Sequence, residues 1–165
     1  ERLKRQMRVK ETPKLHTASR AYIDFMQLGG SIRMQDLSGA LIRRYLKKSI
    51  PILTGLCSTY LYGCSREFGV DLRPDDLAGY ATGHFVVLCG YDPKRGKVTV
   101  ADPYRPNPLG KDHLYEVSLD RLVCSILLGV LTYDANLLVI RPRRESEKRR
   151  PRTTAAKRSE HEMTS

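Results

Sequence analysis

Residues 83–103 read GHFVVLCGYDPKRGKVTVADP, the most informative stretch of the chain. An apolar run over residues 85–88 is separated from a second apolar segment, residues 98–101, by a turn. The turn contains a Pro, which presets one φ angle, and a Gly, which permits a positive φ. We therefore predict a β-hairpin. Its first strand is expected to be buried on both faces because its apolar residues are continuous.

The hairpin carries a polar residue near each outer end, His84 on the first strand and Asp102 on the second. Pro103 has no amide proton to donate, so the second strand should stop at Asp102. If Tyr91 pairs with Lys97, His84 falls opposite Tyr104 and Asp102 opposite Val86. The two polar residues then become diagonal neighbours on one face, with about 7–8 Å between their backbones. A register slip of one residue would place their side chains on opposite faces.

A histidine beside a carboxylate can activate a thiol or hydroxyl nucleophile. The neutral imidazole takes the proton of the nucleophile and later returns it to the leaving group. The carboxylate fixes the tautomer of the ring and stabilises the imidazolium. The same pattern also fits a histidine at the edge of the core that bonds a backbone carbonyl, with Asp102 as a turn residue before proline. The hairpin by itself leaves both interpretations open.

Three segments together extend this pattern: residues 47–67, KKSIPILTGLCSTYLYGCSRE; residues 83–103; and residues 119–140, LDRLVCSILLGVLTYDANLLVI. Over about residues 14–142, the chain resembles a papain-like cysteine peptidase domain. It specifically resembles the bacteriocin-processing (double-glycine leader) peptidase-like family, in its stand-alone bacterial members. The resemblance implies that His84 is the general base and Asp102 the acid that orients it. It also implies a peptide or protein substrate whose peptide or amide bond is hydrolysed.

The front of the chain departs from this family. The family places its nucleophilic Cys near the start of the domain, in a Cys-Gly-Pro setting that opens a helix, with a Gln just upstream for the oxyanion. No Cys-Gly-Pro occurs here, and the first cysteine is Cys57. We expect the nucleophile-bearing part to lie upstream of this chain or to have been lost, so that the chain alone is inactive.

Two alternatives to this peptidase hypothesis stay within the same fold. Cys57 or Cys64 could serve as the nucleophile, but a reactive Cys is usually found at a helix N-terminus or beside a cation, and neither position is predicted to be so. Alternatively, the chain could be a catalytically inactive peptide-binding module, because a fold does not fix a function.

Nucleic-acid association ranks third. The formal net charge of +11 is concentrated at the ends, since residues 11–140 carry only about +2 of it. A basic tail binds phosphates with a steep salt dependence, but this tail has no aromatic residue for base stacking. We therefore expect no nucleic-acid binding beyond the tail, whose basic residues are Arg141, Arg143, Arg144, Lys148, Arg149, Arg150, Arg152, Lys157 and Arg158.

The four cysteines show no Cys-x-x-Cys pair and no spacing with histidine that suits zinc. Cys89 and Cys124 lie in apolar runs and are predicted to be buried. Reduced thiols and a cytoplasmic location are the default expectation. The sequence contains no phosphate-binding glycine loop and no metal-ligand set, so we predict no cofactor. No apolar stretch has the length of a membrane span.

The remaining patterns predict an α+β domain, the C-terminal part of a papain-like fold, with an antiparallel sheet packed against helices. The expected domain divisions are a charged arm at 1–13, the peptidase-like domain at 14–142 and a disordered basic tail at 143–165. Before the hairpin, the expected elements are a helix over 15–28 stopped by Gly29 and Gly30, a helix capped by Asp36 or Ser38, a strand over 50–56, a strand or helical turn over 58–62, and a loop over 66–79 that borders the cleft. After the hairpin, we expect a strand over 114–117, a helix from the Ser118 cap to Gly129, and a strand over 137–140.

Overall fold

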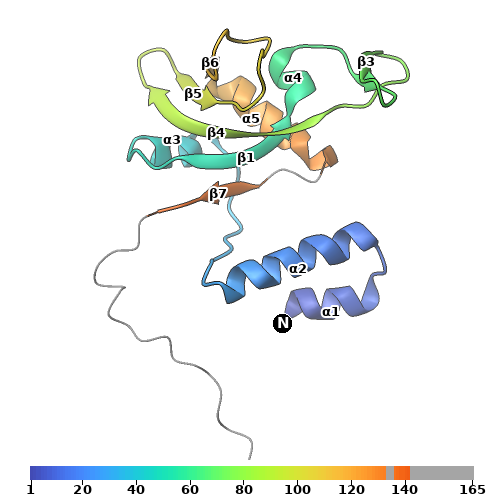
Figure 1. The fold of residues 1–165 in the computed structure, drawn as a ribbon. Coiled ribbons are helices and arrows are strands. Elements are labelled where there is room, and N and C mark those ends of the chain that lie inside the picture. The colour runs from blue at the N-terminus through green and yellow to red at the C-terminus, as the bar shows by residue number, and fades with distance from the viewer. Residues whose placement is uncertain (133–135, 142–165) are drawn as a thin grey trace, which may run out of the picture. The chain divides into compact units, whose positions relative to one another are not determined.

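The computed structural model describes residues 1–132 and 136–141, which fall into two compact units, Glu1–Leu37 and the part that begins at Ser38. The N-terminal unit consists of α1 (Arg2–Val9) and α2 (Pro13–Gln27), which contact each other (Figure 1). Gly29 follows α2 with a φ of +95°, so the predicted helix and its glycine stop are confirmed. The predicted divisions near residues 13 and 142 stay predictions, and the tail at 143–165 lies outside the described residues.

The C-terminal unit is built on a five-stranded antiparallel sheet in the order β6-β5-β4-β1-β7 (Figure 1). The α+β prediction of an antiparallel sheet packed against helices is confirmed. The strands are β1 (Ile52–Cys57), β4 (Gly83–Asp92), β5 (Lys97–Ala101), β6 (Leu114–Ser118) and β7 (Leu137–Val139). A separate short pair, β2 (Glu67–Phe68) with β3 (Arg73–Pro74), lies within the segment predicted as a loop.

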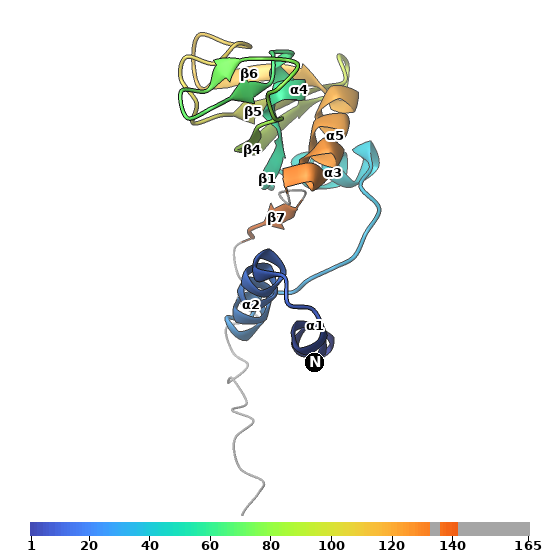
Figure 2. The ribbon, with the colours of Figure 1, turned by 90° about the vertical axis from the view of Figure 1, so that its right-hand side faces the viewer.

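Helices α3 (Gly39–Leu46) and α5 (Leu119–Leu128) pack against one face of this sheet (Figure 2). Each begins at a predicted serine cap, since the hydroxyl of Ser38 accepts from the amide of Leu41 and that of Ser118 from the amide of Arg121. A 3₁₀ turn, η1 (Gly129–Thr132), follows α5. The segment after β1, which the sequence left open between strand and helix, forms the short helix α4 (Ser58–Tyr62).

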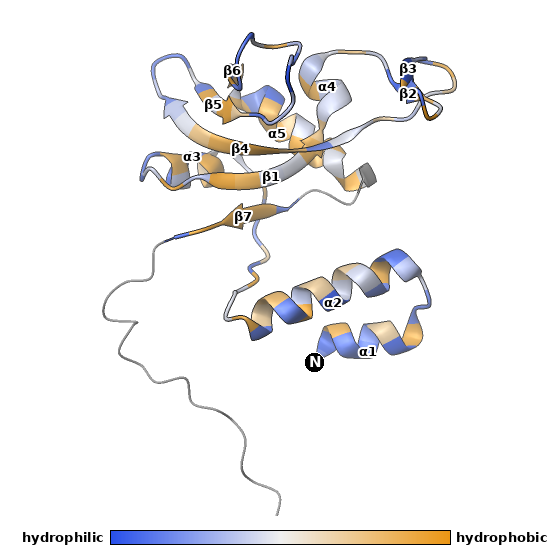
Figure 3. Cartoon of the chain, viewed as in Figure 1, coloured by the Kyte–Doolittle hydropathy of each residue, from blue (hydrophilic) through white to orange (hydrophobic). Residues whose placement is uncertain are grey.

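The core lies between the sheet and these helices. Side chains alternate between the two faces of a strand, so β4 and β5 each bury every second residue against the helices. Figure 3 shows the apolar character of β1 and β4. The most deeply buried apolar side chains are Ile42, Ile52, Leu56, Leu61, Val86, Leu88, Val98, Val100, Leu122 and Ile126.

The prediction that residues 85–88 are buried on both faces is wrong. Val86 and Leu88 are buried, but Phe85 is 52% exposed, although its strand β4 lies between β1 and β5 in the sheet. The continuous apolar run suggested a strand covered on both sides, whereas within this unit α3 and α5 lie on one face only (Figure 2). The prediction of buried cysteines is also wrong for Cys89 and Cys124, which are both exposed.

The turn of the β4–β5 hairpin differs from the predicted register by one residue. Tyr91 pairs with Val98, not with Lys97, and Lys97 pairs with Asp92 instead. The side chain of Asp92 closes the turn by accepting from two backbone amides of the following residues, and Gly96 adopts a φ of +63°. If this register continued along the hairpin, the outer ends of the two strands would be out of step with the prediction.

A β-bulge at Cys89 corrects this difference. Beyond the bulge, Val87 pairs with Ala101, and continuing that register by one residue brings Asp102 level with Val86, as predicted for this end of the hairpin. An extra residue on one strand shifts all later pairs by one, and a one-residue shift changes the face on which each side chain lies. The bulge therefore places the side chain of Asp102 on the same face of the sheet as that of His84.

We expect the two faces of β4 to differ sharply in their contribution to stability. Leu88→Ala removes a fully buried side chain and should lower the free energy of unfolding by about 2–5 kcal/mol. Phe85→Ala, on the half-exposed face, should cost less than about 1.5 kcal/mol. Urea unfolding of the two variants measures both values. Equal losses would contradict the one-sided packing.

Candidate active site

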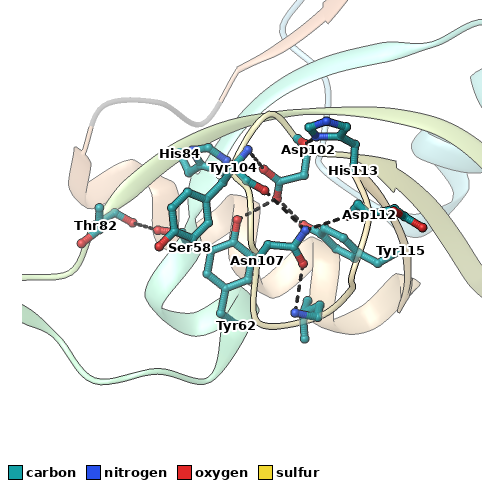
Figure 4. Close-up of polar contacts among 11 residues, drawn as sticks. Ser58, Tyr62, Thr82, His84, Asp102, Tyr104, Asn107, Asp112, His113 and Tyr115 are labelled. Carbon is teal, nitrogen blue, oxygen red and sulfur yellow. Dashed lines mark hydrogen bonds and ion pairs between the residues drawn. The ribbon is translucent and has the colours of Figure 1, made fainter.

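The structure brings His84 and Asp102 into direct contact. His84 is the second residue of β4, Asp102 directly follows β5, and Nε2 of the histidine lies 2.7 Å from Oδ1 of the aspartate (Figure 4). The imidazole is 24% exposed, whereas the carboxylate is fully buried. Among the described residues, no hydrogen bond occupies Nδ1 of His84. The ring is therefore held at one nitrogen and open at the other.

The carboxylate of Asp102 accepts four hydrogen bonds. Oδ1 accepts from His84 and, at 2.8 Å, from the backbone amide of Tyr104. Oδ2 accepts from the hydroxyls of Tyr62 and Tyr115, each at 2.7 Å (Figure 4). A buried charge is costly unless donors compensate it, and here both oxygens have two donors each. The four donors therefore fix the orientation of the carboxylate and satisfy the hydrogen-bonding capacity of both oxygens.

These contacts shift the ionisation of the whole cluster. Burial acts to raise the pKa of Asp102, but the hydrogen bonds from His84, Tyr62, Tyr115 and the amide of Tyr104 outweigh it, so this pKa lies below its ordinary value. Burial, together with the hydrogen bond to Asp102, raises the pKa of Tyr62 and of Tyr115 far above the ordinary value. At neutral pH the aspartate is therefore ionised, and both tyrosines keep the protons that they donate.

The backbone of Asp102 is fixed as firmly as its side chain. Its amide donates to the carbonyl of His113 at 2.8 Å, and its carbonyl accepts from Nδ1 of His113 at 3.0 Å. The intervening loop is braced by the buried Asn107, which donates to the carbonyl of Asp112 and accepts from the amide of Leu109. The position at the end of β5 is thus maintained by backbone contacts with His113 just before β6.

Two aromatic rings, those of Tyr62 and Tyr104, flank the imidazole of the pair. The ring centroids of His84, Tyr62 and Tyr104 lie 6.1–6.4 Å from one another, and His84 meets Tyr104 edge-to-face. Tyr104 is 53% exposed, so its ring forms a surface next to the imidazole. Aromatic rings at such distances attract each other and limit each other's motion.

Sequence reasoning missed Tyr62, Tyr104 and Tyr115. A signal existed for Tyr115, because the alternation along residues 114–118 places it on the same face as the buried Val117. For Tyr62 no signal was available, since the segment that carries it was open between strand and helix. Only the tertiary structure places α4 beside the end of β5.

Neither candidate cysteine of this chain meets His84. Leu56 pairs with His84 and Cys57 with Gly83, so the side chain of Cys57 points to the opposite face of the sheet and is 4% exposed. The expectation that no helix begins beside Cys57 is wrong, because α4 starts at the next residue. Cys64 is exposed, and its Sγ lies 3.9 Å from the carbonyl of Thr59.

The acidic residues of the loop over 66–79 shape the loop itself. Asp75 accepts from the amides of Ala78 and Leu77, which lower its pKa. Asp76 accepts from the hydroxyl of Ser65 and the amide of Arg66. Within residues 1–132 and 136–141, no cluster of three or more His, Cys, Asp or Glu side chains has an arrangement that could hold a metal ion. In the same residues, no helix combines the length and the apolar character needed to cross a bilayer.

An antiparallel sheet packed on helices is consistent with a papain-like, cysteine peptidase-like fold. Residues 11–121 match the model of the Peptidase_C39 like family, and the chain belongs to this family. No curated protein and no solved structure matches the chain.

The stability of the protein should depend on the ionisation of Asp102. Because the pKa of this carboxyl is lowered by folding, its contribution is present above the ordinary value of about 4 and is lost as the pH falls through the lower folded value. At pH 7, Asp102→Asn should lower the free energy of unfolding by about 2 kcal/mol or more, and this difference should shrink toward pH 3. Urea unfolding at several pH values measures it.

Asp112→Asn is the matched control, since Asp112 lies in the same loop but its side chain is 82% exposed. We expect this variant to differ little from the unchanged protein at any pH. A loss in Asp102→Asn that stayed constant from pH 7 to pH 3 would contradict an ionised, stabilising carboxylate.

Proposed function

We propose that this chain supplies the general base, His84, and the orienting acid, Asp102, of a cysteine peptidase that hydrolyses a peptide or amide bond. The observation that carries the proposal is the 2.7 Å contact between the imidazole and a carboxylate that is buried, ionised and held by three further donors. A purely structural histidine does not need a partner fixed in this way. Membership of the Peptidase_C39 like family supports the same reaction class.

The contact at Nε2 supports Nδ1 as the nitrogen that transfers the proton. With Asp102 accepting from Nε2–H, the neutral ring presents the lone pair of Nδ1. Nδ1 would take the proton of a thiol as the sulfur attacks the carbonyl carbon, and the resulting imidazolium would give that proton to the leaving amine. Water then hydrolyses the acyl-enzyme, with Nδ1 accepting the proton of the water and returning it to the thiol.

The nucleophilic Cys is proposed to lie upstream of residue 1. Cys57 faces away from His84, and no described thiol hydrogen-bonds to the imidazole, which supports a nucleophile from outside this chain. By its resemblance, the proposed substrate is a peptide or protein. We also propose a cytoplasmic location, which the four free cysteines support.

A catalytically inactive peptide-binding module is the second candidate. The observation that favours it is the same lack, among the described residues, of a thiol in contact with His84. In that case the His84–Asp102 pair would serve only to shape the surface formed with the ring of Tyr104. The coding sequence upstream of residue 1 separates the two candidates, because only the enzyme requires a Cys there.

The test is to extend the chain by its upstream coding sequence and to label it with a thiol-directed peptide warhead. We expect labelling that falls by about 10²-fold or more in His84→Ala, the range typical of general acid–base catalysis. Cys57→Ser should label normally. His16→Ala is the matched histidine control, since the imidazole of His16 bonds the carbonyl of Lys10 and not a carboxylate. The peptidase proposal fails if no upstream Cys exists or if labelling is unchanged in His84→Ala.

A further inference from the structure

Helix α4 is tied directly to the segment that leads into His84. The amide and the hydroxyl of Ser58, at the start of the helix, both donate to the carbonyl of Thr82 at 2.9 Å. In return, the amide of Thr82 donates to the hydroxyl of Thr59 at 3.0 Å. Thr82 lies two residues before His84. A displacement of α4 would therefore also displace the beginning of β4.

The other end of α4 is held by Arg121 from α5. Its Nε donates to the carbonyl of Leu61 at 2.9 Å, and its Nη2 donates to the carbonyl of Tyr60 at 2.8 Å. The same guanidinium lies 5.4 Å from the centroid of the Tyr60 ring. The last carbonyls of a helix lack partners within the helix and carry partial negative charge, so a cation at this place satisfies them. Tyr62, the last residue of α4, is thereby fixed in position.

The hydroxyl of Tyr62 reaches Asp102 from this anchored helix, while that of Tyr115 reaches it from β6. Both donate to Oδ2, which leaves Oδ1 for His84 and for the amide of Tyr104. A carboxylate with donors on only one oxygen could rotate or exchange its partner for water. Two hydroxyl donors on the far oxygen prevent this rotation and keep Oδ1 directed at Nε2.

We propose that Tyr62, together with Tyr115, is a positioning residue that acts on His84 through Asp102. The tyrosine hydroxyls hold the carboxylate in the orientation that fixes the proton of the neutral imidazole on Nε2 and leaves Nδ1 as the base. This inference rests on the proposed role of the His84–Asp102 pair. It adds that helix α4, anchored by Thr82 and Arg121, is the element that sets the geometry of the pair.

The test uses the full chain labelled with ¹⁵N-histidine and needs no nucleophile. NMR measures the rate at which the Nε2–H proton of His84 exchanges with solvent, and the ¹⁵N shifts that report its tautomer. Tyr62→Phe removes only the hydroxyl and should accelerate this exchange by about tenfold, the equivalent of one lost hydrogen bond to a charged group. Tyr115→Phe should act in the same direction, so the inference does not depend on the folding of a single variant.

Two controls separate positioning from a general loosening of the fold. Tyr60→Phe changes a tyrosine of the same helix whose ring contacts Arg121, and it should leave the His84 signal unchanged. His113 bonds the backbone carbonyl of Asp102, so its own signal should stay constant in Tyr62→Phe. A change in His84 alone supports the inference.

Asp102→Asn distinguishes failure of this inference from failure of the proposed function. If Asp102→Asn alters the His84 signal but both tyrosine variants leave it unchanged, the pair stands and the positioning role of the tyrosines is overturned. If Asp102→Asn also leaves the signal unchanged, the orienting role of the aspartate fails, and both proposals fail with it.

Discussion

The buried carboxylate of Asp102 is the constraint on which the arrangement of the site depends. A carboxylate without solvent requires donors on both oxygens, and here these come from four places in the chain: β4, the loop after β5, α4 and β6. Each donor must be held at a distance near 2.7–2.8 Å, so the relative positions of these elements are restricted by one side chain. The carboxylate thus fixes the positions of its donors, and the hydrogen bonds from these donors lower the pKa of Asp102.

The chemistry follows from how this carboxylate divides its contacts. One oxygen meets tyrosine hydroxyls whose pKa values are raised, so that they remain donors, and the other meets the imidazole. This division holds the ring by Nε2 and leaves Nδ1 without a hydrogen bond among the described residues, as the proposed proton transfer requires. The rings of Tyr62 and Tyr104 flank the imidazole, and Tyr104 is exposed. Such an arrangement is consistent with the base role proposed for His84 in a chain of the Peptidase_C39 like family.

Much of the fold could be predicted from local patterns. The β4–β5 hairpin, the serine caps of α3 and α5, and the glycine stop after α2 depend on residues that are close in sequence, and all three are confirmed. Exposure was predicted less well, because it depends on what packs against a strand. The run around Phe85 is continuous and apolar, yet the described helices of its unit cover one face, so half of that ring is exposed.

The sequence pattern places His84 and Asp102 in one hairpin, since both flank its apolar strands and Pro103 ends the second. It did not determine that they share a face. The turn is shifted by one residue from the predicted pairing, and the bulge at Cys89 restores the register that lets the two side chains meet. Tertiary structure alone decided the rest: α4 and β6 are distant in sequence from Asp102, and only packing brings Tyr62 and Tyr115 to its second oxygen. Hydrogen bonds between distant segments leave no periodic trace in a sequence, whereas turns, caps and strand alternation do.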